Sequence, residues 1–120
     1  MKTWAVVGLG KNPERAAFGV AKLLQDKGHR IIPVYPRAET VHGEVGYKTL
    51  SEIPGPVDVV DCFVNSTLVG KVVDEAIAIG AKAVWLQLDV IDNDAIARAQ
   101  AAGLITVMDR CPAIEYRKKS

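Results

Sequence analysis

The stretch AVVGLGKNPERAAFG, residues 5–19, decides how this chain folds. It starts as a short apolar strand, enters Gly8-Leu9-Gly10, and continues through a polar turn into a helical pattern. A nucleotide-binding β-α-β unit begins in this order, with a strand, closely spaced glycines and then a helix. The same pattern also occurs in an ordinary tight turn between a strand and a helix. Pro13 stands where a dinucleotide loop has its third glycine. The context favours a phosphate-binding loop, but not a standard dinucleotide one.

Length and composition limit the possible functions. The 120 residues suit a single domain, residues 1–120, and the 49% apolar and 24% charged shares are those of a globular protein. A net charge of +1 gives no basic field that would favour nucleic acid or an anionic membrane as a partner. Cys62 and Cys111 are too few for a disulfide framework and lack metal-ligand spacing. That spacing leads us to expect no metal site. No apolar run approaches membrane-spanning length, so we expect a cytoplasmic protein.

Strand-like and helix-like segments alternate along the chain. Short, nearly continuous apolar runs are typical of parallel strands that are covered on both faces. The pattern predicts an α/β fold with a Rossmann-like, doubly wound, mainly parallel five-stranded sheet and helices on both faces. We expect the order 3-2-1-4-5, with the strand that ends at Phe63 beside the first strand and a small extra strand near residues 44–47. The five main strands are predicted at residues 3–8, 30–35, 57–63, 82–88 and 104–109.

Three helices are predicted between these strands. Asn12 is expected to cap the first helix, with Pro13 in its first position, where the missing N–H costs nothing. The second helix is expected to start near Ser66, and the third is expected to be capped by Asp92. Each ends before a glycine that precedes a strand, and these are Gly28, Gly80 and Gly103.

The end of the second strand indicates which nucleotide the loop would hold. An NAD site would have Asp or Glu there to accept from the ribose hydroxyls, but the chain has Tyr35-Pro36-Arg37 and no carboxylate until Glu39. Arg37 is either a solvated surface charge or a planar set of donors for a phosphate. Together with the glycines it favours a phosphorylated ribose, which fits both NADP and coenzyme A. The chain is too short for the second half and substrate domain of a dinucleotide dehydrogenase, which favours coenzyme A.

Five motifs distributed over essentially the whole chain indicate a family resemblance. They are VVGLGKNPER (6–15), GHRIIPVYP (28–36), IPGPVDVVDCF (53–63), GAKAVWLQLDV (80–90) and DRCPAIEY (109–116). In these motifs the chain resembles the small stand-alone CoA-binding domain proteins. It is also similar to the CoA-binding amino-terminal domain of the succinyl-CoA synthetase α subunit. Many relatives have serine or threonine at position 10 and asparagine at position 35, where this chain has Gly10 and Tyr35.

The resemblance implies a Rossmann-like domain that binds coenzyme A. In the family, the first loop takes the diphosphate and the end of the second strand lies near the ribose phosphate. Segments after the third strand and around the fourth flank the adenine. The residues of this chain at those positions are Gly8, Leu9, Gly10, Asn12, Arg15, Tyr35, Arg37, Phe63, Asn65, Ser66 and Gln87.

Three functions fit these observations. The first is a module that binds CoA or acyl-CoA without catalytic residues, because the enzyme relatives carry their phosphorylated histidine on a separate domain that an unidentified protein partner would have to supply. The second is a small NADP-binding reductase module. The third is a thiol redox module in which Cys111, next to Arg110, pairs with the CoA thiol, although a structural turn at Cys111-Pro112 is the simpler interpretation.

Overall fold

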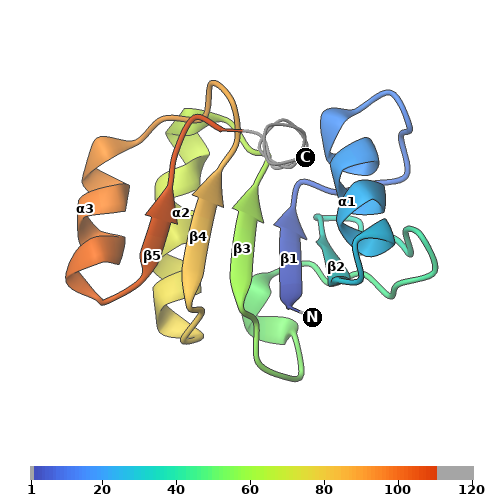
Figure 1. Cartoon of the computed structure of the whole chain (residues 1–120), viewed down its shortest axis with the longest axis horizontal. Coiled ribbons are helices and arrows are strands. Elements are labelled where there is room, and N and C mark those ends of the chain that lie inside the picture. The colour runs from blue at the N-terminus through green and yellow to red at the C-terminus, as the bar shows by residue number, and fades with distance from the viewer. Residues whose placement is uncertain (1, 111–120) are drawn as a thin grey trace.

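The computed structural model describes residues 2–110, which form a single parallel sheet with helices on its two faces (Figure 1). The strands are β1 (Thr3–Val7), β2 (Arg30–Val34), β3 (Val59–Cys62), β4 (Ala83–Leu86) and β5 (Ile105–Val107). The helices are α1 (Ala16–Asp26), α2 (Ser66–Ala78) and α3 (Asn93–Ala101), with a 3₁₀ turn, η1 (Leu50–Glu52), between β2 and β3. The predicted α/β fold, its parallel five-stranded sheet and its covered faces are confirmed.

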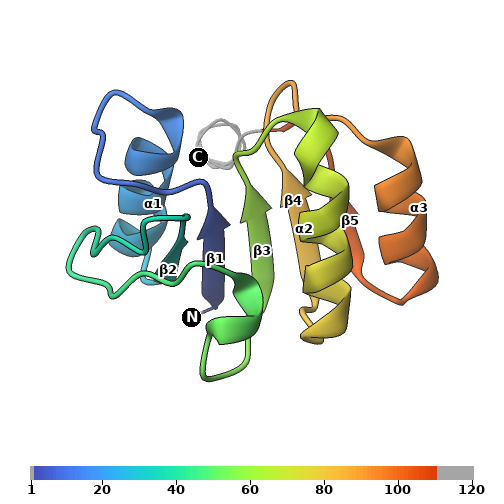
Figure 2. The ribbon, with the colours of Figure 1, turned by 180° about the vertical axis from the view of Figure 1, so that it is seen from behind.

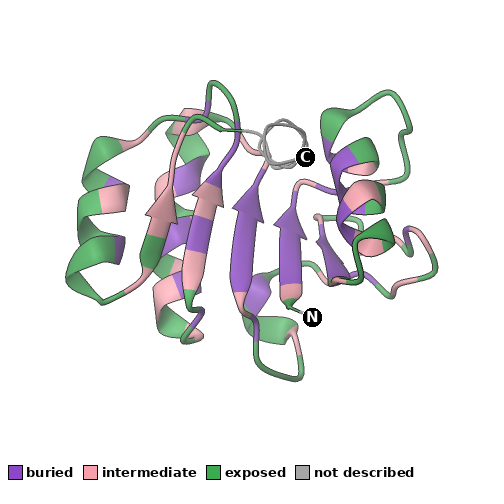
Figure 3. Ribbon diagram, viewed as in Figure 1, coloured by how far each residue is buried: buried purple, intermediate pink, exposed green. Residues whose placement is uncertain are grey.

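The central strands are apolar because both of their faces are covered. Every residue of β3 is buried, and so is β1 after its first residue (Figure 3). Ala5, Val60 and Val84 are fully buried and contribute to one apolar core between the sheet and α2. Trp4 and Leu24 belong to a second core between the sheet and α1. The sheet therefore supports a core on each side and holds its carboxyl edge rigidly.

The strands lie in the order β2-β1-β3-β4-β5, and every neighbouring pair is parallel. As expected, the strand leading to Phe63 lies beside β1. The five strands do not have the predicted order 3-2-1-4-5. Numbered along the chain, their order is 2-1-3-4-5, because the segment after β2 forms no third strand at the outer edge of β2. Residues 44–47, where an extra strand was expected, contribute one parallel bridge, from Tyr47 to Val34. The tight turn between Val41 and Glu44 leaves too little extended chain for more.

Helices cover the two faces unequally. Helix α1 lies on the face that Figure 1 presents, in front of β2, whereas η1 and α2 come forward when the molecule is turned by 180° (Figure 2). Helix α3 packs against α2 and β5. Because the crossovers change face between β1 and β3, the sheet has its topological switch point there, where doubly wound proteins bind ligands.

The predicted helix ends are mostly confirmed. Helix α2 starts at Ser66, and α3 starts after Asp92, whose Oδ1 accepts from the Ala95 N–H at 3.0 Å. The predicted start of α1 at Pro13 is wrong, since the helix begins at Ala16. The backbone carbonyl of Asn12 instead accepts from the Arg15 N–H at 3.1 Å, which closes a turn with proline in its second position. The segment from Gly8 to Arg15 is therefore an open loop.

Candidate functional site

The loop after β1 crosses the carboxyl edge of the sheet at the switch point. Gly8 makes the crossing, with a φ of +100° that residues other than glycine rarely adopt. Its N–H donates to the Val34 carbonyl at 2.8 Å, and a Cβ on Gly8 would lie 2.7 Å from the Phe63 carbonyl oxygen. The loop is thus held closely against the ends of both neighbouring strands, and its position is determined by backbone contacts.

A cavity of about 420 Å³ lies between this loop and the segment after β2. The structure brings six of the predicted residues together in it: Gly8, Gly10, Asn12, Arg15, Tyr35 and Arg37. Two further lining residues were not predicted, Lys11 and Glu39. Lys11 follows the second glycine directly, so its place in the loop was a usable signal. No local pattern could indicate Glu39, because a turn of the chain brings it back to the loop.

The charges around the cavity favour an anionic ligand. Lys11, Arg15 and Arg37 contribute three cationic side chains, and Glu39 contributes the one carboxylate of the lining. All three cations are exposed, and none has an ion-pair partner in the part of the chain that the structure describes. Since the whole chain is nearly neutral, this is a local concentration of positive charge that can bind a phosphate.

One wall of the cavity is aromatic. A Cβ built on Gly10 would lie 3.5 Å from Cε2 of Tyr35, so the ring faces the second glycine of the loop. The Tyr35 N–H donates to the Tyr47 carbonyl at 3.0 Å, which fixes the strand end that carries the ring. Leu9, also predicted at the site, is fully buried in the core under α1 and does not line the cavity.

The other predicted residues lie along the same edge but do not line the cavity. Asn65 caps α2, since its Oδ1 accepts from the Thr67 N–H at 2.9 Å. The Ser66 hydroxyl donates to the Asp89 carbonyl at 3.2 Å and accepts from the Ile91 N–H at 2.9 Å. These polar groups are bonded within the protein, and they tie the start of α2 to the loop after β4.

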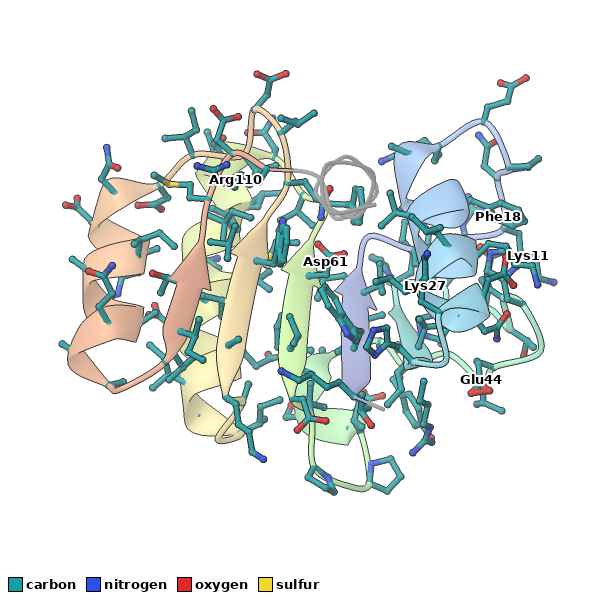
Figure 4. All side chains as sticks on the ribbon, viewed as in Figure 1. Lys11, Phe18, Lys27, Glu44, Asp61 and Arg110 are labelled. Carbon is teal, nitrogen blue, oxygen red and sulfur yellow. The ribbon has the colours of Figure 1, made fainter. Side chains whose placement is uncertain are left out.

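Gln87 is buried beside β3 and donates from its Nε2 to Oδ1 of Asp61, a fully buried carboxyl. Oδ2 of Asp61 has no hydrogen-bond partner. Burial raises the pKa of Asp61 to about 8, against the smaller opposing effect of the Gln87 hydrogen bond. Figure 4 places Asp61 toward the carboxyl end of β3. Burial also raises the pKa of the Cys62 thiol, which lies in the apolar core between the sheet and α2.

Two kinds of site are not found among residues 2–110. No group of three or more His, Cys, Asp or Glu side chains there could hold a metal ion. None of the helices described is both long and apolar enough to cross a bilayer. Cys111, the predicted thiol contact, lies outside the described residues.

The comparisons with known proteins show the family to which the chain belongs. The family model described as a CoA binding domain matches residues 2–117, so the chain belongs to that family. Over 110 residues it is 34% identical to the uncharacterized protein YneT of Bacillus subtilis, covering 92% of this chain and 82% of that one. It is also 35% identical over 81 residues to the α subunit of an ADP-forming acetate–CoA ligase II of Pyrococcus furiosus, covering 67% of this chain but 18% of the subunit.

Solved structures repeat the fold. A hypothetical protein from Pyrococcus horikoshii superposes with a TM-score of 0.93 at 39% identity, covering 98% of this chain and 82% of that one. A Thermus thermophilus protein superposes with a TM-score of 0.90 at 32% identity, covering 98% of this chain and 89% of that one. A dinucleotide-forming acetyl-coenzyme A synthetase of Ca. Korarchaeum cryptofilum, at 23% identity and a TM-score of 0.78 over 90% of this chain and 26% of that one, shares the fold.

Proposed function

We propose that this member of the CoA-binding domain family binds coenzyme A or an acyl-CoA non-covalently at the glycine loop and carries out no reaction alone. The observation that carries the proposal is the cavity beside Gly8 and Gly10, where three cationic side chains gather at the switch point of the sheet. Coenzyme A carries a diphosphate and a ribose phosphate on one nucleotide, so it matches a small site with several cations.

The diphosphate is assigned to the loop of residues 8–15. Gly10 has no Cβ to shield the backbone, so an anion can approach the loop closely. Helix α1 begins at Ala16 with its positive end toward the cavity, and its N-cap residue Arg15 makes no side-chain capping hydrogen bond. An uncapped helix start beside cationic side chains supports phosphate binding.

The ribose phosphate is assigned to Arg37, and binding measurements on Arg37→Ala test it. Calorimetry is expected to show a loss of about 1.5–3 kcal/mol for CoA, the range for hydrogen bonds to charged groups, and little loss for 3′-dephospho-CoA. Arg30→Ala, which removes an exposed arginine from the opposite end of β2, is the control and is expected to bind both ligands normally. Equal losses for both ligands in Arg37→Ala would contradict the assignment.

Thermal-shift and native mass measurements test the ligand itself. CoA at 100 times its dissociation constant is expected to stabilise the protein by about 2.7 kcal/mol, whereas NADP at the same concentration is expected to give a smaller shift. Native mass spectrometry of the purified protein reports bound CoA or acyl-CoA and any associated protein that supplies catalysis. A larger shift with NADP would favour the reductase alternative instead.

A further inference from the structure

The carboxylate of Glu39 lies in the cationic cavity, against the loop that the proposal assigns to the diphosphate. Its Oε1 accepts from the backbone N–H of Lys11 at 3.2 Å, across 28 positions of sequence. A Cβ on Gly10 would lie 3.1 Å from the same oxygen. The carboxylate therefore touches both residues at the centre of the loop.

The backbone holds Glu39 in this place. The Ala38 N–H donates to the Tyr35 carbonyl at 2.8 Å, and Ala38 has a φ of +49°, which turns the chain back after β2. Gly46 then passes so close that a Cβ there would lie 2.2 Å from the Glu39 carbonyl oxygen. A left-handed residue and an obligate glycine fix the segment, so the backbone position of Glu39 beside the loop is a property of the fold.

A carboxylate in a site for a polyanion has a specific consequence. It accepts a hydrogen bond from a ribose hydroxyl, and it repels a phosphate on the same carbon. Arg37, two residues earlier and in the same cavity, has the opposite preference. Together the two side chains match a ribose that carries one free hydroxyl and one phosphate.

We infer that Glu39 accepts from the free ribose 2′-hydroxyl while Arg37 binds the 3′-phosphate, so that the site takes 3′-phosphorylated and rejects 2′-phosphorylated adenosine nucleotides. The inference rests on the proposed function, because in coenzyme A the 2′-hydroxyl is the free hydroxyl of the ribose. It separates coenzyme A from NADP, whose phosphate is on the 2′ position. The selection thus depends on Glu39, and Arg37 alone would accept either isomer.

Adenosine 3′,5′-bisphosphate and adenosine 2′,5′-bisphosphate are matched probes, since they differ only in the position of one phosphate. We would measure each by competition against CoA, with the native protein, Glu39→Gln and Glu44→Gln. Gln keeps a side-chain oxygen that can accept from the Lys11 N–H, so the loop keeps its support. Glu44 is on the same segment but does not line the cavity, and it lies well away from Lys11 in Figure 4. It controls for the loss of one charge.

The native protein is expected to prefer the 3′,5′ isomer by about ten-fold or more, and Glu39→Gln is expected to remove most of that preference by admitting the 2′,5′ isomer. Glu44→Gln is expected to keep the native preference. An unchanged preference in Glu39→Gln, tighter CoA binding by that variant, or no competition by either isomer would overturn the inference. Failure of the native protein to bind CoA at all would instead overturn the proposed function.

Discussion

Two strand-to-helix junctions meet at the carboxyl edge of the sheet, and they differ in length and in the capping of the helix that follows. The open junction, residues 8–15 between β1 and α1, is an eight-residue loop beside a cavity, and its helix starts without a side-chain cap. The closed junction, residues 63–65 between β3 and α2, is short, and Asn65 caps its helix. Both follow buried parallel strands, so the difference lies in the junctions themselves.

The comparison explains why one junction is the better ligand site. At the closed junction, Asn65 and Ser66 are bonded within the protein, and a ligand would have to replace those hydrogen bonds. At the open junction, Lys11 and Arg15 keep their charged groups without an ion pair in the described part of the chain, and so does Arg37 across the cavity. Proximity to the switch point is therefore not sufficient, because the site also needs charged side chains that form no ion pair within the protein.

The largest expected effect concerns the buried carboxyl below the closed junction. The folded pKa of Asp61, about 8, exceeds its unfolded value of 3.8, so the folded state binds an extra proton between these values. This contribution to stability is fully present below the unfolded pKa and is lost as the pH rises through about 8. From pH 5 to pH 8 the loss reaches at most about 4 kcal/mol. Urea unfolding of the native protein and Asp61→Asn at both pH values is expected to show this loss in the native protein alone.

Asp58, at the other end of β3, provides a control of opposite sign. Its carboxylate accepts from the Thr3 N–H at 2.8 Å, which lowers its pKa, with a smaller contribution from Lys82. Asp58→Asn is therefore expected to cost stability at neutral pH and progressively less as the pH falls below its unfolded pKa. If Asp61→Asn behaved in the same way, the carboxyl of Asp61 would be ionised and the assigned pKa would be wrong.

Gly8→Ala is expected to damage the open junction through the backbone. The φ of +100° and the 2.7 Å approach of a Cβ to the Phe63 carbonyl both oppose a side chain there. We expect a loss of about 2–3 kcal/mol in unfolding free energy, at the upper end of the effects of strained backbone. Gly55→Ala, at a position with open space around it, is the matched control and is expected to be nearly neutral. A neutral Gly8→Ala would mean that the loop can shift away from β3.

Gly10→Val tests the open junction as a ligand site, with less effect on folding. A Cβ there would be 3.1 Å from Oε1 of Glu39, and the added methyl groups would occupy the space assigned to the diphosphate. CoA affinity is expected to fall at least about ten-fold, or 1.4 kcal/mol, in calorimetry on the folded variant. Gly19→Val, on α1 with nothing near its Cβ, is expected to bind CoA normally. Normal CoA binding by folded Gly10→Val would move the site elsewhere.

Replacing the two asparagines by alanine compares the junctions directly and has the smallest expected effect. Asn65→Ala removes the α2 cap and is expected to lower the unfolding free energy by about 1 kcal/mol, with CoA affinity nearly unchanged. Asn12, whose Oδ1 accepts from the Glu14 N–H at 3.0 Å within an exposed turn, lines the cavity. Asn12→Ala is therefore expected to lower CoA affinity more than stability. If Asn65→Ala lost affinity and kept its stability, the closed junction would belong to the ligand site.

Local patterns in the sequence predicted most of the fold. The apolar runs, the capping Asp92 and the glycines after each helix act within a few residues of chain, so they can be recognised without knowing what lies across the sheet. The same holds for the loop glycines and for Arg37, which mark a phosphate site by their positions relative to a strand end. The start of α1 was mistaken because Asn12 and Pro13 suit a tight turn as well as a helix cap.

The tertiary structure alone decided which of these polar residues line the cavity. Glu39 meets Lys11 across 28 positions, and Gln87 meets Asp61 across 26. Contacts of this kind depend on how strands are ordered and how loops return, and no local propensity encodes them. The sequence by itself therefore determined the α/β fold and indicated which loop to propose as the anion-binding one. Only the folded chain placed the Glu39 carboxylate in the cavity and joined Ser66 to the loop after β4, because both results require distant segments to come within hydrogen-bonding distance.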